Sequence, residues 1–460
     1  MHIPFATNGS YPVRNGNRVR PLIDGEPAFR RICEAVEAAR SSVWVTVAFL
    51  QDGFQMPDGR GSVFDVLDRA AGRGLDVRVN FWRVNAESGF AAETVFSGDE
   101  THRRMLAERG AKFLARWDRA QKAYCQHQKS WLIDAGADGE IAFVGGINLS
   151  NDSVVSPGHV SPGHVGRDHG HIHDVYVELV GPSASDVHHN FVQRWNEASE
   201  RHAHDGSWPD AQRAGDLSFP ERLSPSAGTI TAQVQRTVRA GHYSDDTAAP
   251  GGAAFPIAGG ESTVFEQYQK AIAAARSSIY LENQALGCPQ TVEALHNALR
   301  RGVEVVVLTP ADANSFMKAA RKDARSKPFY DRFDALGEHE RFTLAGIAAA
   351  DPAGKLRNIY VHAKAAVIDD CWATIGSCNI GARSFFGDTE MNVTFWAPDV
   401  ARQMRVDLLR EHLGVDTAEM DDRAAFALYR KRARSNAAKM ANGQALEGLA
   451  FEMNPRSYAM

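Results

Sequence analysis

An internal repeat that runs through both halves of the chain constrains its fold more than any other feature. Three pairs of segments align between the halves: 35–45 with 271–281, 66–79 with 294–307, and 174–182 with 390–398. The spacing between paired segments changes only where one half carries an extra loop. A repeat of this length predicts two copies of one structural unit, since duplicated sequences with local insertions keep the same fold.

Each copy of the repeat carries the pattern His-x-Lys-x-x-x-x-Asp. The six residues are His127, Lys129 and Asp134 in the first half, and His362, Lys364 and Asp369 in the second. In both halves a turn of small residues and an asparagine follow: Gly146 and Asn148, then Ser377 and Asn379. One such match means little in a chain of 460 residues, but two matches with the same trailing residues indicate a duplicated site.

The spacing of apolar residues predicts alternating helices and strands in each half. Helices are expected over residues 29–40 and 265–276, and Gly74 and Gly302 stand where further helices should end. The His-x-Lys segments alternate polar and apolar residues at period two, so each His and its Lys should share one face of a strand. The predicted fold class is α/β, with two tandem α/β/α sandwich domains that each contain a mixed, largely buried sheet.

The length of the chain agrees with two domains of roughly 200 residues each. The predicted boundaries are an N-terminal domain over 1–215, a linker over 216–228, a C-terminal domain over 229–416 and a helical tail over 417–460. The tail lies outside the repeat and carries the basic run 430–434. That run predicts either a solvated helix face or a patch that attracts anionic lipid headgroups.

Composition excludes several classes of protein. The net charge of −5 and the pI of about 6.4 give no global electrostatic case for nucleic-acid binding. No apolar segment approaches the roughly 18–20 residues of a membrane span, and no secretory signal is visible. We therefore expect a cytoplasmic or peripheral membrane protein, with signal-free export left open. The five cysteines lack metal-site spacing and are expected to be reduced thiols.

The two motifs and their surroundings resemble the phospholipase D superfamily over nearly the whole chain. Segments 143–149, 173–182, 191–196 and 279–284 are most similar to the lipid-hydrolysing branch of that superfamily. The resemblance implies that the two domains are related by a pseudo-twofold axis. It also implies that both motifs meet at the domain interface and form one active site.

The residue chemistry fits cleavage of a phosphodiester. One neutral imidazole can attack phosphorus while the other, protonated, acts as the acid. We assign His127 as the nucleophile, which forms a phosphohistidine, and His362 as the general acid and later base. This order follows from the resemblance, because the sequence itself is symmetric and leaves the order open.

The remaining polar residues of the motifs are expected to surround the phosphate. Lys129, Lys364, Asn148 and Asn379 should contact its oxygens, and four such donors need no metal or other cofactor. Gly146 and Ser377, in the turns, are expected to lie against substrate.

Two pairs of acidic residues receive different roles. Asp174 and Glu390 are equivalent in the two halves and are expected to orient the histidines through their second ring nitrogens. Asp134 and Asp369 belong to the motifs but lie an odd number of residues from His and Lys. We expect them to brace the strand rather than to touch substrate.

Two loops are also expected to take part in substrate binding or access. The loop 52–61 is expected to expose Phe54 and Met56, which would grip lipid. The insertion 154–173 contains histidines at 159, 164, 169, 171 and 173. Their spacing fits no ligand pattern, so we expect no metal site there but a flexible loop over the active-site entrance, with His173 touching substrate.

The leading hypothesis is a monomeric phospholipase D that acts on phospholipid at a membrane surface. Its products would be phosphatidic acid when water is the acceptor, and a phosphatidyl ester when an alcohol is. Three alternatives stay open: a cardiolipin synthase-like phosphatidyltransferase, a nuclease or other phosphodiesterase of the superfamily, and a phospholipid-binding pseudoenzyme. The acidic composition and the full duplication argue against nucleic acid as the substrate.

Overall fold

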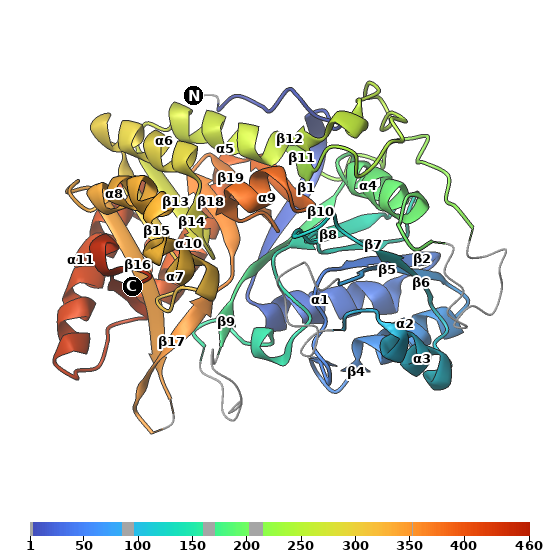
Figure 1. The fold of residues 1–460 in the computed structure, drawn as a ribbon, viewed down its shortest axis with the longest axis horizontal. Coiled ribbons are helices and arrows are strands. Elements are labelled where there is room, and N and C mark those ends of the chain that lie inside the picture. The colour runs from blue at the N-terminus through green and yellow to red at the C-terminus, as the bar shows by residue number, and fades with distance from the viewer. Residues whose placement is uncertain (1–2, 85–95, 160–170, 202–214, 352) are drawn as a thin grey trace.

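The structure is a computed structural model that describes residues 3–84, 96–159, 171–201, 215–351 and 353–460. It has two α/β halves that lie side by side along the longest axis of the molecule (Figure 1). Among the described helices, none is both long enough and apolar enough to cross a membrane.

The sheet of the first half contains seven strands in the order β6-β5-β2-β7-β8-β10-β1. Their bounds are β1 (Arg14–Ile23), β2 (Ser42–Val47), β5 (Asp76–Trp82), β6 (Leu114–Asp118), β7 (Ser130–Ile133), β8 (Ile141–Gly145) and β10 (Val175–Val180). Strands β2, β5 and β6 are parallel to one another, whereas every other neighbouring pair is antiparallel.

The second half repeats this order strand for strand, as β16-β15-β13-β18-β19-β21-β11. Their bounds are β11 (Ile230–Val238), β13 (Ser278–Asn283), β15 (Glu304–Leu308), β16 (Phe342–Ala350), β18 (Lys364–Ile368), β19 (Trp372–Gly376) and β21 (Glu390–Trp396). The parallel and antiparallel pairings are also the same. The predicted duplication of a mixed-sheet α/β unit is therefore confirmed.

Helices cover both faces of each sheet. Those of the first half are α1 (Gly25–Ala38), α2 (Val63–Gly72), α3 (Glu100–Arg109) and α4 (Ala184–Asn196). Those of the second half are α5 (Thr263–Ala274), α6 (Pro289–Arg300), α7 (Ser315–Lys322), α8 (Lys327–Leu336), α9 (Ala382–Phe386), α10 (Pro398–Leu413) and α11 (Asp422–Ala441). Gly74 and Gly302 follow α2 and α6 with φ angles of 86° and 85°, which glycine adopts without strain.

The remaining strands complete the fold. They are β3 (Gln55–Met56), β4 (Gly61–Ser62), β9 (Ile172–His173), β12 (Glu261–Ser262), β14 (Leu286–Gly287), β17 (Leu356–Val361), β20 (Ile380–Gly381) and β22 (Ala450–Glu452). Strand β9 of the first half pairs with β17 of the second. This pairing places the end of the His-rich insertion at the boundary between the halves.

The two halves share one continuous sheet and one core layer. Strand β1 pairs with β10 along its later part and with β11 near its start, so the sheet crosses from one half to the other. Buried apolar residues of both halves, including Val177 and Val393, belong to the same core cluster. The N-terminal segment also packs on the second half, where Ile3 is buried and the Ala6 amide donates to Gln267 Oε1 at 2.8 Å.

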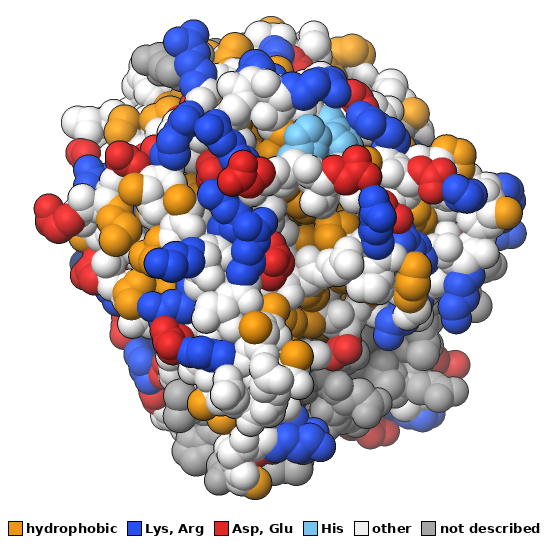
Figure 2. Space-filling model, turned by 90° about the vertical axis from the view of Figure 1, so that its left-hand side faces the viewer, with side chains coloured by type: hydrophobic (Ala, Val, Ile, Leu, Met, Phe, Trp, Pro, Cys, Tyr) orange, Lys and Arg blue, Asp and Glu red, His pale blue; other side chains and the backbone are white. Residues whose placement is uncertain are grey.

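The C-terminal tail is part of the second half rather than a separate appendage. Helix α11 packs into the core through Phe426 and Tyr429, and β22 pairs with β16. All three arginines of the basic run form ion pairs: Arg430 with Glu304, Arg432 with Glu447 at 2.8 Å and Arg434 with Glu452 at 3.0 Å. On the face shown in Figure 2, basic and acidic side chains are interspersed. These pairs favour the solvated helix face over a headgroup-binding patch.

Candidate active site

The two motifs enter the structure as extended segments that lead into central strands. Strand β7 begins at Ser130 and β18 at Lys364, so both histidines precede the strands that were predicted to contain them. The backbone explains the late start, because His127 N donates to Thr389 O at 2.9 Å and His362 N donates to His173 O at 2.8 Å. In each case the partner lies in the other half. The histidines therefore belong to the contact between the halves rather than to a ladder within one sheet.

The orienting acids are exchanged between the halves, which means that each histidine contacts the acid of the other half. His127 Nδ1 lies 2.9 and 3.0 Å from the two carboxylate oxygens of Glu390, and His362 Nδ1 lies 2.6 Å from Asp174 Oδ2. Glu390 also accepts a hydrogen bond from Ser377 Oγ at 2.5 Å. Each imidazole thus has Nδ1 fixed by a carboxylate, which leaves Nε2 as the nitrogen that can react.

Two lysines bring positive charge to the same place. Lys129 Nζ donates to His127 O at 2.8 Å, and Lys364 Nζ donates to the His362 carbonyl and lies 3.3 Å from Gln284 Oε1. Both lysines are buried, and neither forms an ion pair with a carboxylate within the described residues. Two buried ammonium groups of this kind favour an anion as the ligand of the site.

Burial and the lysine charges control the protonation of the site. Burial, followed by Lys129 and Lys364, holds the pKa of His127 well below its ordinary value. Burial and Lys364 likewise lower the pKa of His362 to about 3. Burial raises the pKa of Glu390 to about 7. Without a bound anion, both imidazoles are therefore neutral near pH 7, and a neutral imidazole is the nucleophilic form.

The motif aspartates brace the sheet, as predicted, and lie away from the histidines. Asp134 Oδ1 accepts hydrogen bonds from the backbone amides of Arg40, Ser41 and Ser42 at 2.8, 2.7 and 3.3 Å. Asp369 accepts the equivalent bonds from the amides of residues 276–278. Both aspartates have positive φ angles, 55° and 52°, which Asp and Asn tolerate better than most residues.

Substitution of Asp134 is therefore expected to lower stability rather than to remove a reacting group. Asp134→Ala should decrease the free energy of unfolding by about 3 kcal/mol, because three backbone donors lose a charged acceptor and alanine disfavours the positive φ. Asp134→Asn is the matched control and should cost about half as much, since it keeps one acceptor oxygen and tolerates that φ. Urea unfolding measures both values. Full stability of Asp134→Ala together with lost activity would contradict this role.

The turns after β8 and β19 place small residues against the site. A Cβ atom at Gly146 would lie 2.4 Å from Asp174 Oδ1 and 3.0 Å from Lys364 Cδ, so only glycine fits there. Ser377 is fully buried and donates to Glu390, which makes it a positioning residue rather than the expected substrate contact. Asn148 and Asn379 are half-buried, and each has a buried side-chain oxygen without a hydrogen-bond partner within the described chain.

Three further expected substrate contacts are also wrong. Phe54 and Met56 are 2% and 3% exposed and belong to the core of the first half, where Phe54 packs edge-on against Phe29. The hairpin of β3 and β4 folds inward, so these residues are unable to grip lipid. His173 is also completely buried, and its two ring nitrogens contact Asp24 and Glu282 rather than an open site.

The predicted loop over the active-site entrance falls mostly outside the described residues, which omit 160–170 with His164 and His169. The described ends of the insertion are ordered parts of the fold. His159 is 2% exposed, and its carbonyl oxygen lies 2.9 Å from His171 Nδ1.

Sequence reasoning missed two residues beside the motifs. The Phe49 ring lies 5.8 Å from the His127 ring and 5.6 Å from Lys129 Nζ. Gln284 contacts Lys364 and donates to the Tyr360 hydroxyl at 2.9 Å. Gln284 comes directly after the central strand β13, and Phe49 comes two residues after the equivalent strand β2. The position at the carboxyl end of such a strand was the available signal, because ligand sites gather there in α/β sheets.

Comparisons with known proteins agree with this architecture. Residues 268–411 match the family described as "Cardiolipin synthase, PLD-like domain". The chain is 25% identical to Phospholipase D beta 2 of Arabidopsis thaliana over 492 residues, covering 80% of this chain and 53% of the plant protein. It is 24% identical to Cardiolipin synthase A of Pseudomonas entomophila (strain L48), covering 82% and 64%. The chain thus spans about half to two thirds of the length of these two relatives.

A solved structure shows the same fold over nearly the full length. It is the phosphatidylserine synthase of Haemophilus influenzae Rd KW20, with a TM-score of 0.56 and 13% identity, covering 93% of this chain and 95% of that one. The fold and the site together define a class of duplicated α/β proteins with one composite His–Lys site between their halves. Within that class, the chain belongs to the phospholipase D superfamily.

Proposed function

We propose that this protein is a phosphodiesterase that cleaves the headgroup ester of glycerophospholipids through a phosphohistidine. The observation that supports this function best is the exchange of acids. The site lies buried between the halves and brings together two neutral imidazoles, each oriented by a carboxylate. It also contains two lysine ammonium groups that form no ion pair with a carboxylate within the described residues. That set supplies a nucleophile, an acid and charge compensation for a phosphodiester.

In the proposed mechanism, Lys129 and Lys364 hold the non-bridging phosphate oxygens, with Asn148 and Asn379 as further donors. Burial and then the lysine charges depress the imidazole pKa values. The bound anion offsets the lysine charges, so one histidine can carry a proton in the complex. His127 Nε2 attacks phosphorus, and His362 protonates the departing headgroup oxygen. His362 then accepts a proton from water or an alcohol, whose oxygen displaces His127 from phosphorus.

The choice of acceptor distinguishes hydrolysis from phosphatidyl transfer. Water yields phosphatidic acid, whereas an alcohol yields a phosphatidyl ester. The similarity to Cardiolipin synthase A makes a headgroup hydroxyl of a second phospholipid a specific alternative acceptor. Both reactions use the same phosphohistidine, so one assay with competing acceptors tests them together.

The deciding experiment is mass spectrometry of lipid products after incubation with mixed phospholipid vesicles and a primary alcohol. Wild type and the control His339→Asn, a half-buried histidine outside the site, are expected to produce phosphatidyl-alcohol. His127→Asn is expected to produce none, and His362→Asn at most a trace. The identity of the consumed lipid names the headgroup. If wild type yields no product from any phospholipid, this function is wrong and other phosphodiesters become the substrates to test.

The pH dependence of kcat/KM follows from Lys364. Burial lowers the pKa of this lysine to about 7, so the ammonium is charged below that pH and neutral above it. Because the charge attracts the substrate phosphate, we expect kcat/KM to fall as pH rises through about 7. Initial rates at low substrate concentration measure this limb. Arginine stays charged throughout, so Lys364→Arg should move the limb to higher pH. If the fall in kcat/KM occurs at the same pH in Lys364→Arg, a group other than Lys364 causes it.

A further inference from the structure

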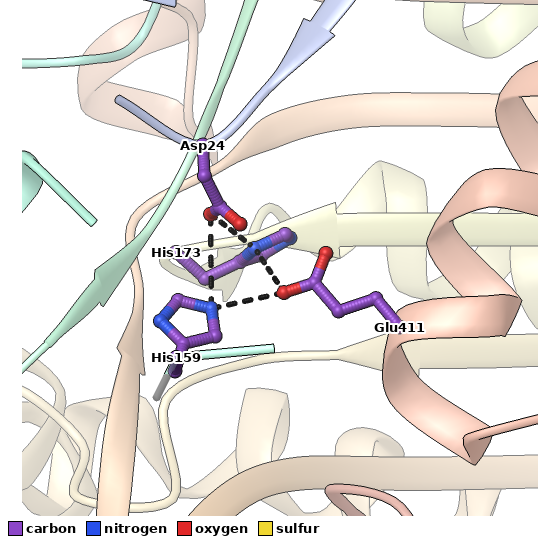
Figure 3. A group of neighbouring side chains, drawn as sticks. All are labelled: Asp24, His159, His173 and Glu411. Carbon is purple, nitrogen blue, oxygen red and sulfur yellow. Dashed lines mark hydrogen bonds and ion pairs between the residues drawn. The ribbon is translucent and has the colours of Figure 1, made fainter. Parts of the chain in front are cut away.

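A second buried cluster of ligand-type side chains lies beside the catalytic pair, where His173 O accepts a hydrogen bond from His362 N. It contains Asp24, His159, His173 and Glu411, whose nearest nitrogen and oxygen atoms all lie within 4.8 Å of one another. The four side chains point toward a common centre (Figure 3). The side chains of the first three are 0% exposed and that of Glu411 is 3% exposed. The mechanism above uses none of them.

The distances in the cluster match those between the ligands of one metal ion. His159 Nε2 lies 3.1 Å from Glu411 Oε1 and 3.7 Å from Asp24 Oδ1. His173 Nδ1 lies 2.9 Å from Asp24 Oδ1 and 3.8 Å from Glu411 Oε1. Ligands about 2.0–2.1 Å from a tetrahedral zinc ion are about 3.3–3.4 Å apart. The observed distances lie on both sides of that value.

Several atoms of the cluster lack hydrogen-bond partners. Within the described chain, neither ring nitrogen of His159 makes a hydrogen bond, although Nε2 lies 3.1 Å from a carboxylate oxygen. Asp24 Oδ2 and Glu411 Oε2 are also buried without a partner. Buried polar atoms are nearly always satisfied, so an approach this close without a hydrogen bond points to a missing central group.

The local backbone supports this assignment. Asp24 occupies the N-cap position of α1, yet its side chain does not cap the helix, and its φ angle is 64°. An aspartate at an N-cap ordinarily accepts a bond from the helix amides, which contributes about 1 kcal/mol. Here the carboxylate faces His173 instead. His159 also has a positive φ angle, 54°, as it directs its ring inward.

The surroundings of His173 resemble the outer shell of a metal site. Its Nε2 lies 3.1 Å from Glu282 Oε2, and Glu282 Oε1 accepts a hydrogen bond from the Tyr280 hydroxyl at 2.7 Å. A histidine that binds metal through one nitrogen usually donates its other N–H to a carboxylate, which fixes the ring and raises its basicity. This contact leaves Nδ1 of His173 directed at the centre.

We propose that Asp24, His159, His173 and Glu411 form a structural site for a divalent first-row transition metal, with zinc the favoured ion. Two imidazoles and two carboxylates suit such an ion, whereas calcium and magnesium prefer oxygen ligands alone. Two carboxylate ligands make the occupied site neutral, which removes the cost of placing like charges together in the interior. Four protein ligands leave no open position, as is typical of structural zinc.

The metal joins the two halves of the protein. Asp24 directly follows β1, His159 and His173 lie in the insertion 154–173, and Glu411 comes from α10 of the second half. His173 is followed directly by Asp174, the acid that orients His362. Metal binding therefore holds β9 against the second half and supports the active site without taking part in the reaction. The histidine spacing hid this site, because two of the four ligands are carboxylates distant in sequence.

Metal content of the full chain tests the proposal and does not depend on the enzymatic activity. The protein is produced without a histidine tag in zinc-supplemented medium and analysed by inductively coupled plasma mass spectrometry. Wild type is expected to contain about one zinc per chain, and His159→Gln little above background. His339→Gln, a histidine outside the cluster, and His362→Asn, in the catalytic pair, are expected to keep the metal. No metal in wild type, or equal metal in His159→Gln, overturns the proposal.

A second measurement on wild type covers the case in which His159→Gln does not fold. Cobalt in place of zinc is expected to give the visible absorption bands of a tetrahedral nitrogen–oxygen site. Addition of zinc to metal-depleted wild type should raise Tm by several degrees, since a ligand that binds only the folded state stabilises it. Absence of both the cobalt spectrum and the Tm shift would show that the cluster is a metal-free hydrogen-bonded network.

Discussion

Replacement of His127 by asparagine is expected to lower kcat by about 10⁵-fold or more, because it removes the imidazole proposed to form the covalent intermediate. Asparagine keeps a polar side chain of similar size beside Glu390, so the fold should survive. His362→Asn is expected to lower kcat by about 10³- to 10⁴-fold, the usual contribution of a general acid and base. Steady-state rates with vesicle substrate measure both losses.

An activated substrate separates the roles of the two histidines. A phosphatidyl ester of p-nitrophenol has a leaving group that needs no protonation, so His362→Asn should still release a burst of p-nitrophenol and accumulate the phosphohistidine. His127→Asn should give no burst. Intact-protein mass spectrometry identifies the trapped adduct. A burst from His127→Asn and none from His362→Asn would reverse the assignment, and the two motifs would exchange roles.

Loss of the exchanged acids is expected to have the next largest effect. Glu390→Gln and Asp174→Asn should each lower kcat by about 10²- to 10⁴-fold, because an amide at this position can donate to Nδ1 and select the wrong tautomer. KM should stay within about threefold, since neither acid binds the phosphate. Ser377→Ala is the matched control. It removes only the hydroxyl that donates to Glu390 and should cost about tenfold or less.

Two measurements separate positioning from a merely structural role. Thermal unfolding should show that Glu390→Gln remains folded at the assay temperature. Glu390→Asp should recover part of kcat, because the carboxylate charge returns even though its reach is shorter. If Glu390→Asp is as inactive as Glu390→Gln, while KM rises in both, then the acid acts on substrate binding and not on the tautomer of His127.

The duplicated fold could be predicted from the sequence because its signals depend on residues that are close together in the chain. Gly74 and Gly302 mark the ends of equivalent helices. The His-x-Lys segments likewise recur in both halves, and each signal indicates structure within its own half. The bracing role of Asp134 could be predicted for the same reason, since the period of a strand places it on the opposite face. The sequence therefore predicts which residues are candidates for the active site, but not how they are arranged.

Contacts between the halves could not be predicted in this way. The exchange of Asp174 and Glu390, the burial of His173 and the pairing of β9 with β17 all depend on how the two halves dock. The inward fold of the loop that carries Phe54 is a related case. Its glycines and aspartates predict a turn, but the side on which the turn packs depends on Phe29, a tertiary contact.

The exchange of acids has a consequence for symmetry. In two identical chains related by a twofold axis, every residue and its environment occur twice, so both histidines would have the same acid. Here one covalent chain holds both halves, and the acids differ: aspartate orients His362, and glutamate, with Ser377, orients His127. Fusion into one polypeptide thus frees two equivalent imidazoles to take the different roles proposed for them, nucleophile and proton carrier, while the pseudosymmetric scaffold around them is retained.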